Sequence, residues 1–309
     1  MEIYDTTIIG FGPAGFTAAL YAGRFEMKTM VIGLEFGGYT AKAGIIHNYP
    51  GVKKADGYEL AKTMKEQAEE AGAKFYDGEV VEIEKKDNNF ILKTKDSKTF
   101  YSKTVILATG SERRKMGLPR EKELENKGIH YCVTCDGPVY VGKDIAVVGG
   151  GNAGVSAVLL ASEYARKIYL LAAGEALTAE PLNVDRVKGM KEKVEILYKT
   201  QVKEFLGKER LTGLLLSREF NGSDELKIDG LFVEIGSLPA NKLAKDLGIE
   251  LNDRGYVKSD TSMKTNISGA FVAGDLCDVF GSFKQNITAA ASGALAANSS
   301  YYYLRDLNK

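Results

Sequence analysis

Two of the three cysteines, Cys132 and Cys135, are separated by two residues, and Asp136 directly follows the second. Such a C-x-x-C pair is typical of reactive dithiol chemistry, because it can close a short disulfide and open again with two electrons. A helix N-terminus beside the pair lowers a thiol pKa, so that a thiolate is available near neutral pH. A carboxylate next to a leaving thiolate can supply a proton if partial burial raises the carboxyl pKa. Asp136 could also cap the following helix, and the two roles are compatible.

Two other interpretations of these cysteines are half of a zinc site and a pair of buried thiols. Zinc needs four ligands, and the further candidates are Cys277, His47, His130 or a carboxylate. The redox interpretation is therefore favoured and no metal is expected. Cys277 is expected to be a small packing residue.

Two glycine-rich segments could each bind a phosphate group. The first glycine loop, residues 10–15, reads G-F-G-P-A-G, and the second glycine loop, residues 149–154, reads G-G-G-N-A-G. Each follows a short apolar strand and precedes a helix and a second strand, so each matches G-x-G-x-x-G in the required context. Glycine there lets the backbone approach a pyrophosphate at a helix N-terminus. A merely tight turn is the alternative, and it carries more weight for the second loop.

The composition indicates a soluble globular protein of two domains. The chain has 309 residues, 44% hydrophobic and 27% charged, and this length suggests two cores. Lys and Arg number 41, as do Asp and Glu, so no excess charge favours a nucleic acid. The first residues show no basic leader and no stretch is long enough to span a membrane. We therefore expect a cytoplasmic protein without membrane or nucleic-acid partners.

Several further elements would position these motifs. An amphipathic helix is predicted near residues 58–71, alternating strands over 78–100 with a charged turn at 85–89, and the helix after the second loop through about residue 165. A strand at 104–107 precedes Ala108-Thr109-Gly110, and a late strand at 270–273 precedes Gly274-Asp275. Small residues at strand ends allow a ligand to approach the open edge of an α/β sheet.

Together these motifs resemble the low-molecular-weight thioredoxin reductases, in order and over essentially the whole chain. The resemblance also rests on Gly37-Gly38, Asn48-Tyr49-Pro50-Gly51, Cys132 to Gly137, and Lys284-Gln285. It implies an α/β fold of two Rossmann-like, three-layer (ββα) nucleotide-binding domains, the second inserted into the first. A discontinuous FAD domain would comprise residues 1–115 and 246–309. Residues 116–245 would form an inserted NAD(P)-like domain that carries the redox cysteines.

The resemblance further implies partners and residue roles. Members of the family are homodimers that bind FAD, reduce thioredoxin and alternate between two domain orientations. Cys135 would approach the flavin, Cys132 would attack the substrate disulfide, and Asp136 would serve as acid and base. The Tyr301 to Tyr303 run could cover the flavin or pack at the dimer interface, and interface packing is favoured. The implied FAD contacts are Gly10, Gly12, Pro13, Ala14, Gly15, Glu35, Gly37, Gly38, Asn48, Val81, Ala108, Thr109, Gly110, Gly274, Asp275, Lys284, Gln285 and Asn286.

The sequence departs from the family pattern where a nicotinamide would bind. Relatives that use NADPH carry a His-Arg-Arg stretch, where this chain reads Leu170-Leu171-Ala172-Ala173-Gly174-Glu175. A 2′-phosphate needs several charge-assisted contacts, and Glu175 would repel it. The acidic residue expected after the second loop and the usual Gly-His-x-Pro-Asn are also replaced, the latter by Gly236 to Asn241. These changes leave NADH, with Glu175 on the ribose hydroxyls, or no nicotinamide at all.

This pattern resembles the pyridine-nucleotide-independent branch of the family, whose flavin can be reduced by ferredoxin. A flavin accepts single electrons, so an iron–sulfur carrier is a suitable donor. The basic run Arg113-Arg114-Lys115, with Arg120 and Lys122, could dock an acidic ferredoxin, although a solvated loop is favoured. The alternatives are an enzyme that uses NADH, NADPH or a reduced deazaflavin, and a flavoprotein sensor or electron relay without turnover.

Overall fold

The chain forms two compact units in the computed structural model, which describes residues 2–281 and 283–307. Unit 1 comprises the chain up to Glu112 and from Pro239 onward, and unit 2 comprises Arg113–Leu238. These boundaries differ by a few residues from the expected 115/116 and 245/246. The later boundary moves because helix α8 (Lys242–Asp246) packs on strand β6 of unit 1.

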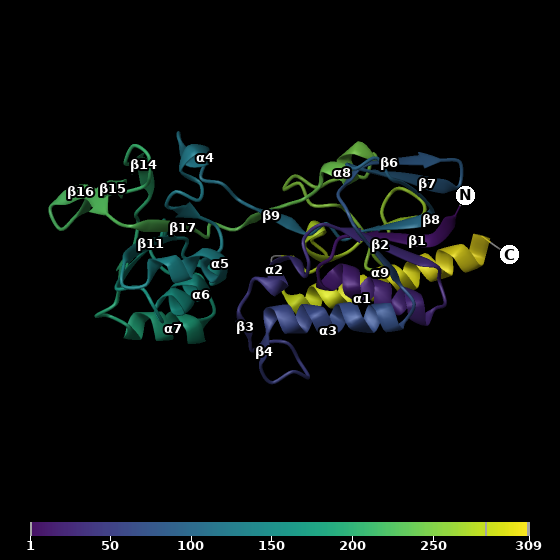
Figure 1. The fold of residues 1–309 in the computed structure, drawn as a ribbon, viewed down its shortest axis with the longest axis horizontal. Helices are drawn as coiled ribbons and strands as arrows, with labels where there is room; N and C mark the ends of the chain where they lie inside the picture. The colour runs from purple at the N-terminus through teal and green to yellow at the C-terminus, as the bar shows by residue number, and fades with distance from the viewer. Residues whose placement is uncertain (1, 282, 308–309) are drawn as a thin grey trace. The chain divides into compact units, whose positions relative to one another are not determined.

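Unit 1 is built on a seven-stranded sheet in the order β5-β2-β1-β8-β7-β6, with β19 also paired to β8 (Figure 1). The pairs around β1, β2, β5, β8 and β19 are parallel, whereas β6, β7 and β8 form an antiparallel meander. Besides α8, the elements of unit 1 are β1 (Ile3–Ile9), α1 (Pro13–Arg24), β2 (Thr29–Gly33), α2 (Gly38–Ala41), β3 (Ile45–Ile46), β4 (Ala55–Asp56), α3 (Gly57–Glu70), β5 (Lys74–Asp77), β6 (Val80–Lys86), β7 (Asn89–Thr94), β8 (Thr99–Leu107), β19 (Ala270–Val272), η2 (Gly274–Leu276) and α9 (Asn286–Leu307).

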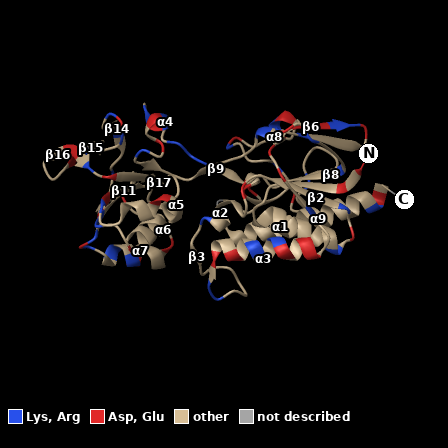
Figure 2. Cartoon of the chain, viewed as in Figure 1, with Lys and Arg blue, Asp and Glu red and all other residues tan. Residues whose placement is uncertain are grey.

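Helices α1, α3 and α9 lie together on one face of this sheet (Figure 1). Small residues permit the close crossing of α1 and α9: a methyl group on Gly293 would come within 2.2 Å of the Ala14 carbonyl oxygen. Helix α3 begins at Asp56, whose carboxylate accepts the Tyr58 amide at 2.9 Å. On its solvent face Lys62 pairs with Glu66, and Lys65 with Glu69, so both signs of charge lie along the helix (Figure 2).

Unit 2 has three layers. Its central sheet is parallel in the order β10-β17-β11-β12-β13, and β14-β15-β16 form a separate antiparallel sheet. Its elements are α4 (Glu121–Leu124), β10 (Ile129–His130), α5 (Val133–Asp136), η1 (Gly137–Tyr140), β11 (Asp144–Val148), α6 (Asn152–Ala161), β12 (Lys167–Leu171), α7 (Pro181–Gly189), β13 (Val194–Leu197), β14 (Val202–Leu206), β15 (Gly213–Phe220), β16 (Ser223–Lys227) and β17 (Gly230–Val233).

Strand β11 shows why the layers form. Ile145 and Val147 pack toward α6 and α7, whereas Ala146 and Val148 pack toward the antiparallel sheet. A parallel strand covered on both faces is apolar at every position, and all four residues are buried. The ββα arrangement confirms the predicted fold class.

Most predicted elements are present with small shifts. The expected helix at 58–71 is α3, and the charged turn at 85–89 joins β6 to β7, with Asp87 in the left-handed region at φ 53°. The helix after the second glycine loop is shorter than predicted, because α6 ends at Ala161 and Ser162 turns its hydroxyl back to the Leu159 carbonyl at 2.6 Å. The chain passes from one unit to the other at β9 (Ser111–Arg113) and returns at β18 (Ser237–Pro239).

Candidate active site

Cys132 and Cys135 form a disulfide, with their Cα atoms 5.3 Å apart. Cys132 precedes the single turn of α5, and its sulfur accepts the Cys135 amide at 3.1 Å. Cys135 is exposed and Cys132 partly so, which leaves the bond accessible to a reactant. The helix at this motif is only four residues long and continues as the short 3₁₀ turn η1. The Cys132 sulfur is therefore stabilised by the single dipole of the Cys135 amide, and not by the combined dipole of a long helix.

Asp136 does not cap the following turn, since its side chain makes no capping hydrogen bond to η1. The capping role expected from the sequence is therefore wrong. Its carboxylate instead lies 3.3 Å from Nδ1 of His130. The Asp136 side chain is 35% exposed, whereas that of His130 is only 7% exposed. The acid expected beside the disulfide is thus in contact with a buried imidazole.

His130 is a residue that the sequence interpretation considered only as a possible zinc ligand. Its Nε2 lies 2.7 Å from the Tyr140 hydroxyl, and its ring stacks on Phe232 at 5.5 Å. Burial lowers the pKa of His130, and the neighbouring Asp136 carboxylate opposes this shift. The signal in the sequence was a histidine two positions before the first cysteine of the pair.

The first glycine loop follows β1, which lies between β2 and β8. Gly10 has φ 127°, and a methyl group there would come within 2.1 Å of the Ala108 carbonyl oxygen. A methyl group on Gly15 would come within 1.9 Å of the Gly10 oxygen. At Gly12, by contrast, no atom of the described chain lies within 4 Å of such a methyl group. The loop is therefore tight at its ends and open at Gly12, as a pyrophosphate beside the α1 N-terminus requires.

The other expected FAD contacts gather at the same edge of unit 1. Gly38 approaches Gly12, and Gly274 approaches Ala14. Asn48 donates to Gln285 at 3.0 Å, and the Thr40 hydroxyl donates to Asn286 at 2.7 Å. Of the other expected contacts, Pro13 begins α1, Gly37 precedes α2, and Thr109, Gly110 and Asp275 follow strand ends.

Three expected contacts are engaged differently. Glu35 forms an exposed ion pair with Lys42 at 2.8 Å. Val81 lies on the edge strand β6 and is 39% exposed. Lys284 bonds to the Cys277 carbonyl, and its ammonium lies 4.5 Å from the centre of the Tyr256 ring.

Burial perturbs the charged groups behind this edge. It raises the pKa of Asp275 and lowers that of Lys284, while attraction between the two groups opposes both shifts. Burial also raises the pKa of Cys277, which is 2% exposed. A protonated, buried thiol is a packing group, as the sequence predicts.

The second glycine loop repeats the tight ends of the first. A methyl group on Gly149 would come within 2.1 Å of the Glu234 carbonyl oxygen, and one on Gly154 within 1.9 Å of the Gly149 oxygen. The middle of the loop differs, because the unit's own chain lies beside it. The Thr178 amide donates to the Gly150 carbonyl at 2.8 Å, and a methyl group on Gly150 would lie 3.4 Å from the Leu177 side chain.

Residues at the strand ends around this loop also differ. Asn152 accepts the Glu180 amide at 2.7 Å and holds segment 177–180 against the loop. Glu234 is buried at the end of β17, where it pairs with Arg113. Burial raises the pKa of Glu234 to about 7, although Arg113 acts against this shift. The carboxylate is a feature that the sequence interpretation did not identify.

The basic run at 113–122 is mostly engaged within unit 2. Arg113 pairs with Glu234, and Lys115 pairs with Glu125 at 2.8 Å. Arg120 donates to the carbonyl oxygens of Gly207 and Lys208 at 2.6 Å and 2.5 Å. These contacts favour an ordinary surface loop over a free cationic docking site.

The C-terminal tyrosines also pack inside their own unit. Tyr301 stacks on Phe25 at 4.7 Å, and Tyr303 meets Phe271 edge to face at 6.2 Å. Tyr302 is 43% exposed. Tyr302 is therefore the most exposed tyrosine of the run, and Tyr301 and Tyr303 are half-buried.

No helix in residues 2–281 and 283–307 has the length and apolar character to cross a membrane. Within the same residues, His, Cys, Asp and Glu form no group of three or more that could hold a metal ion.

Comparison with known proteins assigns the chain to a family. A model described as pyridine nucleotide-disulphide oxidoreductase matches residues 4–294. The chain belongs to this family. It is 36% identical to thioredoxin reductase of Bacillus subtilis (strain 168), over 100% of this chain and 97% of that protein.

Two solved structures of thioredoxin reductases have a fold similar to that of this chain. The thioredoxin reductase of Lactococcus lactis is 32% identical with a TM-score of 0.92, over 98% of this chain and 99% of that chain. A ferredoxin-flavin thioredoxin reductase from Clostridium acetobutylicum is 30% identical with a TM-score of 0.55, over 100% and 99%. This pyridine nucleotide-disulphide oxidoreductase is a flavoprotein disulfide reductase of the thioredoxin reductase type, and its cofactor is FAD. The open first loop fits that cofactor.

Proposed function

We propose that the protein reduces thioredoxin with electrons from ferredoxin, through FAD in unit 1 and the Cys132–Cys135 disulfide in unit 2. The observation that carries the donor assignment is the end of β12. There Ala172, Ala173 and Gly174 stand where an NADPH enzyme needs basic side chains, and Glu175 follows them. Glu175 pairs with Lys199 at 2.6 Å, and both side chains are exposed. This neutral pair offers a 2′-phosphate little net attraction.

The second glycine loop supports the same conclusion. Segment 177–180 bonds to Gly150 and Asn152, where a dinucleotide pyrophosphate would approach the backbone. A nicotinamide would have to share this space with the chain itself. A protein donor of single electrons needs no such cleft, since it reaches the flavin directly.

The residues of unit 1 hold the cofactor in this proposal. The first glycine loop and the α1 N-terminus receive the pyrophosphate, and Asn48 and Gln285 lie with Asn286 at the start of α9. When bound, FAD supplies a group that accepts single electrons and passes two electrons to a disulfide.

The two cysteines then carry the electrons to the substrate. Opening the Cys132–Cys135 bond with two electrons gives one thiolate at each sulfur, and Asp136 supplies a proton to one of them. Cys132 attacks the thioredoxin disulfide and forms a mixed disulfide, and Cys135 then displaces thioredoxin and restores the bond. The net transfer is two electrons and two protons. We further propose that the enzyme is a homodimer, with the exposed Tyr302 as one interface residue.

Two alternatives remain open to test. Lys199 is a cation at the end of the second loop's sheet, so NADH, NADPH or a reduced deazaflavin could serve as donor if Lys199 leaves Glu175. A sensor or relay without turnover is the alternative of another class. The accessible disulfide beside Asp136 favours the enzyme.

The decisive experiment is anaerobic reduction of the purified holoprotein, followed at about 450 nm where flavins absorb. Chemically reduced ferredoxin, NADH, NADPH and reduced deazaflavin are added in parallel, and the thiols formed on thioredoxin are counted. Fast bleaching and thioredoxin turnover with ferredoxin alone are expected. Fast bleaching by either nicotinamide would overturn the donor assignment.

A matched control separates flavin reduction from disulfide transfer. Cys135→Ser is expected to bleach with ferredoxin as fast as the native protein and to yield no thioredoxin thiols. Bleaching of the native protein without thioredoxin turnover would support the sensor or relay instead.

A further inference from the structure

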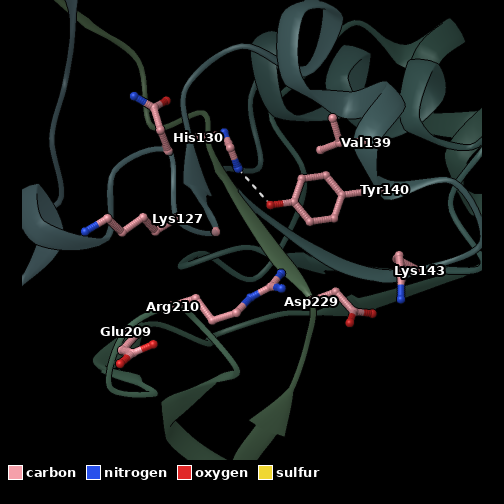
Figure 3. Close-up of a pocket in the computed structure, with 10 residues that line it drawn as sticks. Lys127, His130, Val139, Tyr140, Lys143, Glu209, Arg210 and Asp229 are labelled. Atoms are coloured by element: carbon pink, nitrogen blue, oxygen red, sulfur yellow. Dashed lines mark hydrogen bonds between the residues drawn. The ribbon is translucent and has the colours of Figure 1, made fainter.

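Three side chains form a continuous line away from the redox disulfide. Asp136 Oδ2 lies 3.3 Å from His130 Nδ1, and His130 Nε2 lies 2.7 Å from the Tyr140 hydroxyl. Figure 3 shows His130 and Tyr140 facing each other, with the dashed contact between them. The three residues come from α5, β10 and η1, so the fold of unit 2 brings them together.

The chemistry of the groups sets the direction of the hydrogen bond between His130 and Tyr140. Burial raises the pKa of Tyr140 and lowers that of His130, so both groups are neutral at neutral pH. A neutral phenol donates through its hydroxyl, so Nε2 accepts from Tyr140. The imidazole proton is then on Nδ1. The Asp136 carboxylate lies 3.3 Å from this nitrogen, at an angle that does not form a hydrogen bond in this structure.

The far end of this line opens into a cavity of about 500 Å³. Tyr140 and His130 lie on one side of it, and Arg210 and Asp229 lie across from them (Figure 3). Lys127 and Lys143 on its wall are exposed, so water reaches the cavity. The charged groups that line it are Lys127, Lys143, Glu209, Arg210 and Asp229.

We propose that His130 is a positioning residue for the disulfide chemistry, which orients Asp136 and connects it through Tyr140 to the water of the cavity. The proposal rests on the proposed role of Asp136 as the acid at the disulfide. It adds a route by which Asp136 regains its proton when the thiols are covered by a bound thioredoxin.

The proton balance of this route closes without a further reactant. Asp136 gives one proton to a leaving thiolate and becomes a carboxylate. A rotation of the Asp136 side chain first aligns the carboxylate with Nδ1, and His130 then passes its Nδ1 proton to it while Nε2 takes the hydroxyl proton of Tyr140. Water in the cavity then returns one proton to the tyrosine oxygen. One proton leaves to sulfur and one enters from water, and the imidazole ends in its other neutral tautomer until the ring proton re-equilibrates.

The surrounding charges are compatible with neutral transfer. Asp136 is the acidic group in contact with the imidazole, and Phe232 covers its face. Arg210 lowers the pKa of Tyr140, whereas burial, Asp136 and Asp229 raise it more strongly. The tyrosine therefore keeps its proton between transfers.

The test uses the half-reaction that needs no electron donor. Holoprotein reduced in advance is mixed with oxidised thioredoxin, and the thioredoxin thiols are quantified after rapid acid quench from pH 6 to 9. Tyr140→Phe removes the hydroxyl and keeps the ring, and His130→Gln removes the exchangeable imidazole. Tyr164→Phe is the matched control, because its hydroxyl lies near the same motif, 3.5 Å from the Val133 carbonyl, and its pKa is likewise raised by burial to about 12.

Tyr140→Phe and His130→Gln are expected to slow the first-order step by about tenfold at pH 8, with the dependence on thioredoxin concentration unchanged. This loss is smaller than the roughly 10²–10⁴-fold contribution of complete acid–base catalysis, because Asp136 remains. Tyr164→Phe is expected to stay within twofold of the native rate. Native rates for Tyr140→Phe and His130→Gln across the pH range would overturn the proposal.

A second measurement distinguishes proton supply from simple loss of packing. Imidazole added to His130→Ala is expected to restore the rate in proportion to its concentration, because the adjoining cavity admits it. The rate of the native protein should not respond. If Tyr140→Phe lowered the rate of thioredoxin reduction equally at every pH, and imidazole did not restore the rate of His130→Ala, His130 would have only a structural role.

Asp136→Asn keeps the inference separate from the proposed function. A native rate for Asp136→Asn would remove Asp136 from its proposed role and the relay with it. A large loss in Asp136→Asn combined with native His130→Gln and Tyr140→Phe would leave the proposed function intact and refute only the relay. Failure of ferredoxin as donor changes neither result, since the half-reaction does not use it.

Discussion

The two glycine loops of this protein share a backbone and differ in their neighbours. In both, the first glycine approaches a carbonyl at the end of the adjacent strand, which belongs to Ala108 in unit 1 and Glu234 in unit 2. A methyl group added to either glycine would lie 2.1 Å from that carbonyl oxygen, which is a steric clash. A G-x-G-x-x-G pattern therefore specifies a tight strand-to-helix turn in either place, and the pattern alone does not specify a ligand.

The difference lies in what surrounds the middle of each loop. Gly12 faces open space among the described residues, whereas Gly150 and Gly151 face the side chains of Leu177 and Thr178. The residue that follows the neighbouring strand is Ala108 after β8 in unit 1, and the buried carboxylate Glu234 after β17 in unit 2. A duplicated strand–loop–helix unit can therefore keep its turn while its own chain packs beside the place where a ligand would approach.

The largest expected effect on activity comes from adding one methyl group to the middle of the first loop. A methyl group on Gly12 meets no atom of the described chain, so Gly12→Ala should fold, but the methyl group would occupy the space that we propose for the FAD pyrophosphate. We expect the purified protein to hold less than about a tenth of its flavin, a loss that corresponds to at least about 1.4 kcal/mol of binding. Flavin absorbance relative to protein measures it.

Gly151→Ala is the matched control, since its methyl group would lie 3.7 Å from the Thr178 hydroxyl in ordinary contact. Full flavin content and ferredoxin-driven turnover within twofold of native are expected. A turnover loss in Gly151→Ala comparable to that of Gly12→Ala would show that the second loop also binds a required ligand.

The next effect concerns the strand ends. Glu234 has a pKa raised from 4.5 to about 7, mainly by burial. Folded unit 2 therefore binds more protons than the unfolded chain between these values, so its stability decreases as pH rises through this window, by up to about 3 kcal/mol. Hydrogen exchange of β11 and β17 amides in the intact holoprotein, corrected for intrinsic rates, measures the decrease.

Glu234→Gln should remove this pH dependence, even if it lowers stability overall by changing the partner of Arg113. The amides of β1 and β8 in unit 1 supply the internal reference. There the residue that corresponds to Glu234 is Ala108, which has no ionisable side chain. An equal slope in the native and Glu234→Gln proteins would refute the assignment.

The third prediction compares the two units as receptors. FAD added to the flavin-free protein at about 100 times its dissociation constant should stabilise unit 1 by about 2.7 kcal/mol. NADH or NADPH at millimolar concentration should leave the exchange of unit 2 amides unchanged. Protection of the second glycine loop by either nucleotide would contradict the comparison.

The smallest effect is expected at the contact that holds segment 177–180 against the second loop. Asn152→Ala removes the acceptor for the Glu180 amide, and we expect a loss of about 1 kcal/mol in unit 2. Asn152→Asp retains an acceptor oxygen and serves as the control. Faster exchange of the Thr178 and Glu180 amides in Asn152→Ala, and not in Asn152→Asp, is the measurement; unchanged exchange in both would show that this contact does not hold the segment.

Local patterns were sufficient for much of the fold and for the redox pair. The C-x-x-C spacing predicts a bond that needs only three residues of chain, and the disulfide is present. The spacing of apolar residues predicted the helix α3, the β6–β7 hairpin and the two strand–loop–helix starts, because such spacing depends on near neighbours in sequence. The length of α6 was predicted less well, because a helix end depends on side-chain bonds such as that of Ser162.

The sequence by itself determined where two electrons can be stored, where two nucleotide folds begin and which basic side chains are missing after β12. Only the tertiary structure decided that Gly12 is open while segment 177–180 packs beside the second loop, that Arg113 is bound to Glu234, and that Asp136 faces His130 instead of capping η1. These contacts join residues from different elements. Their distances follow from how sheets and helices pack, which spacing along the chain does not encode.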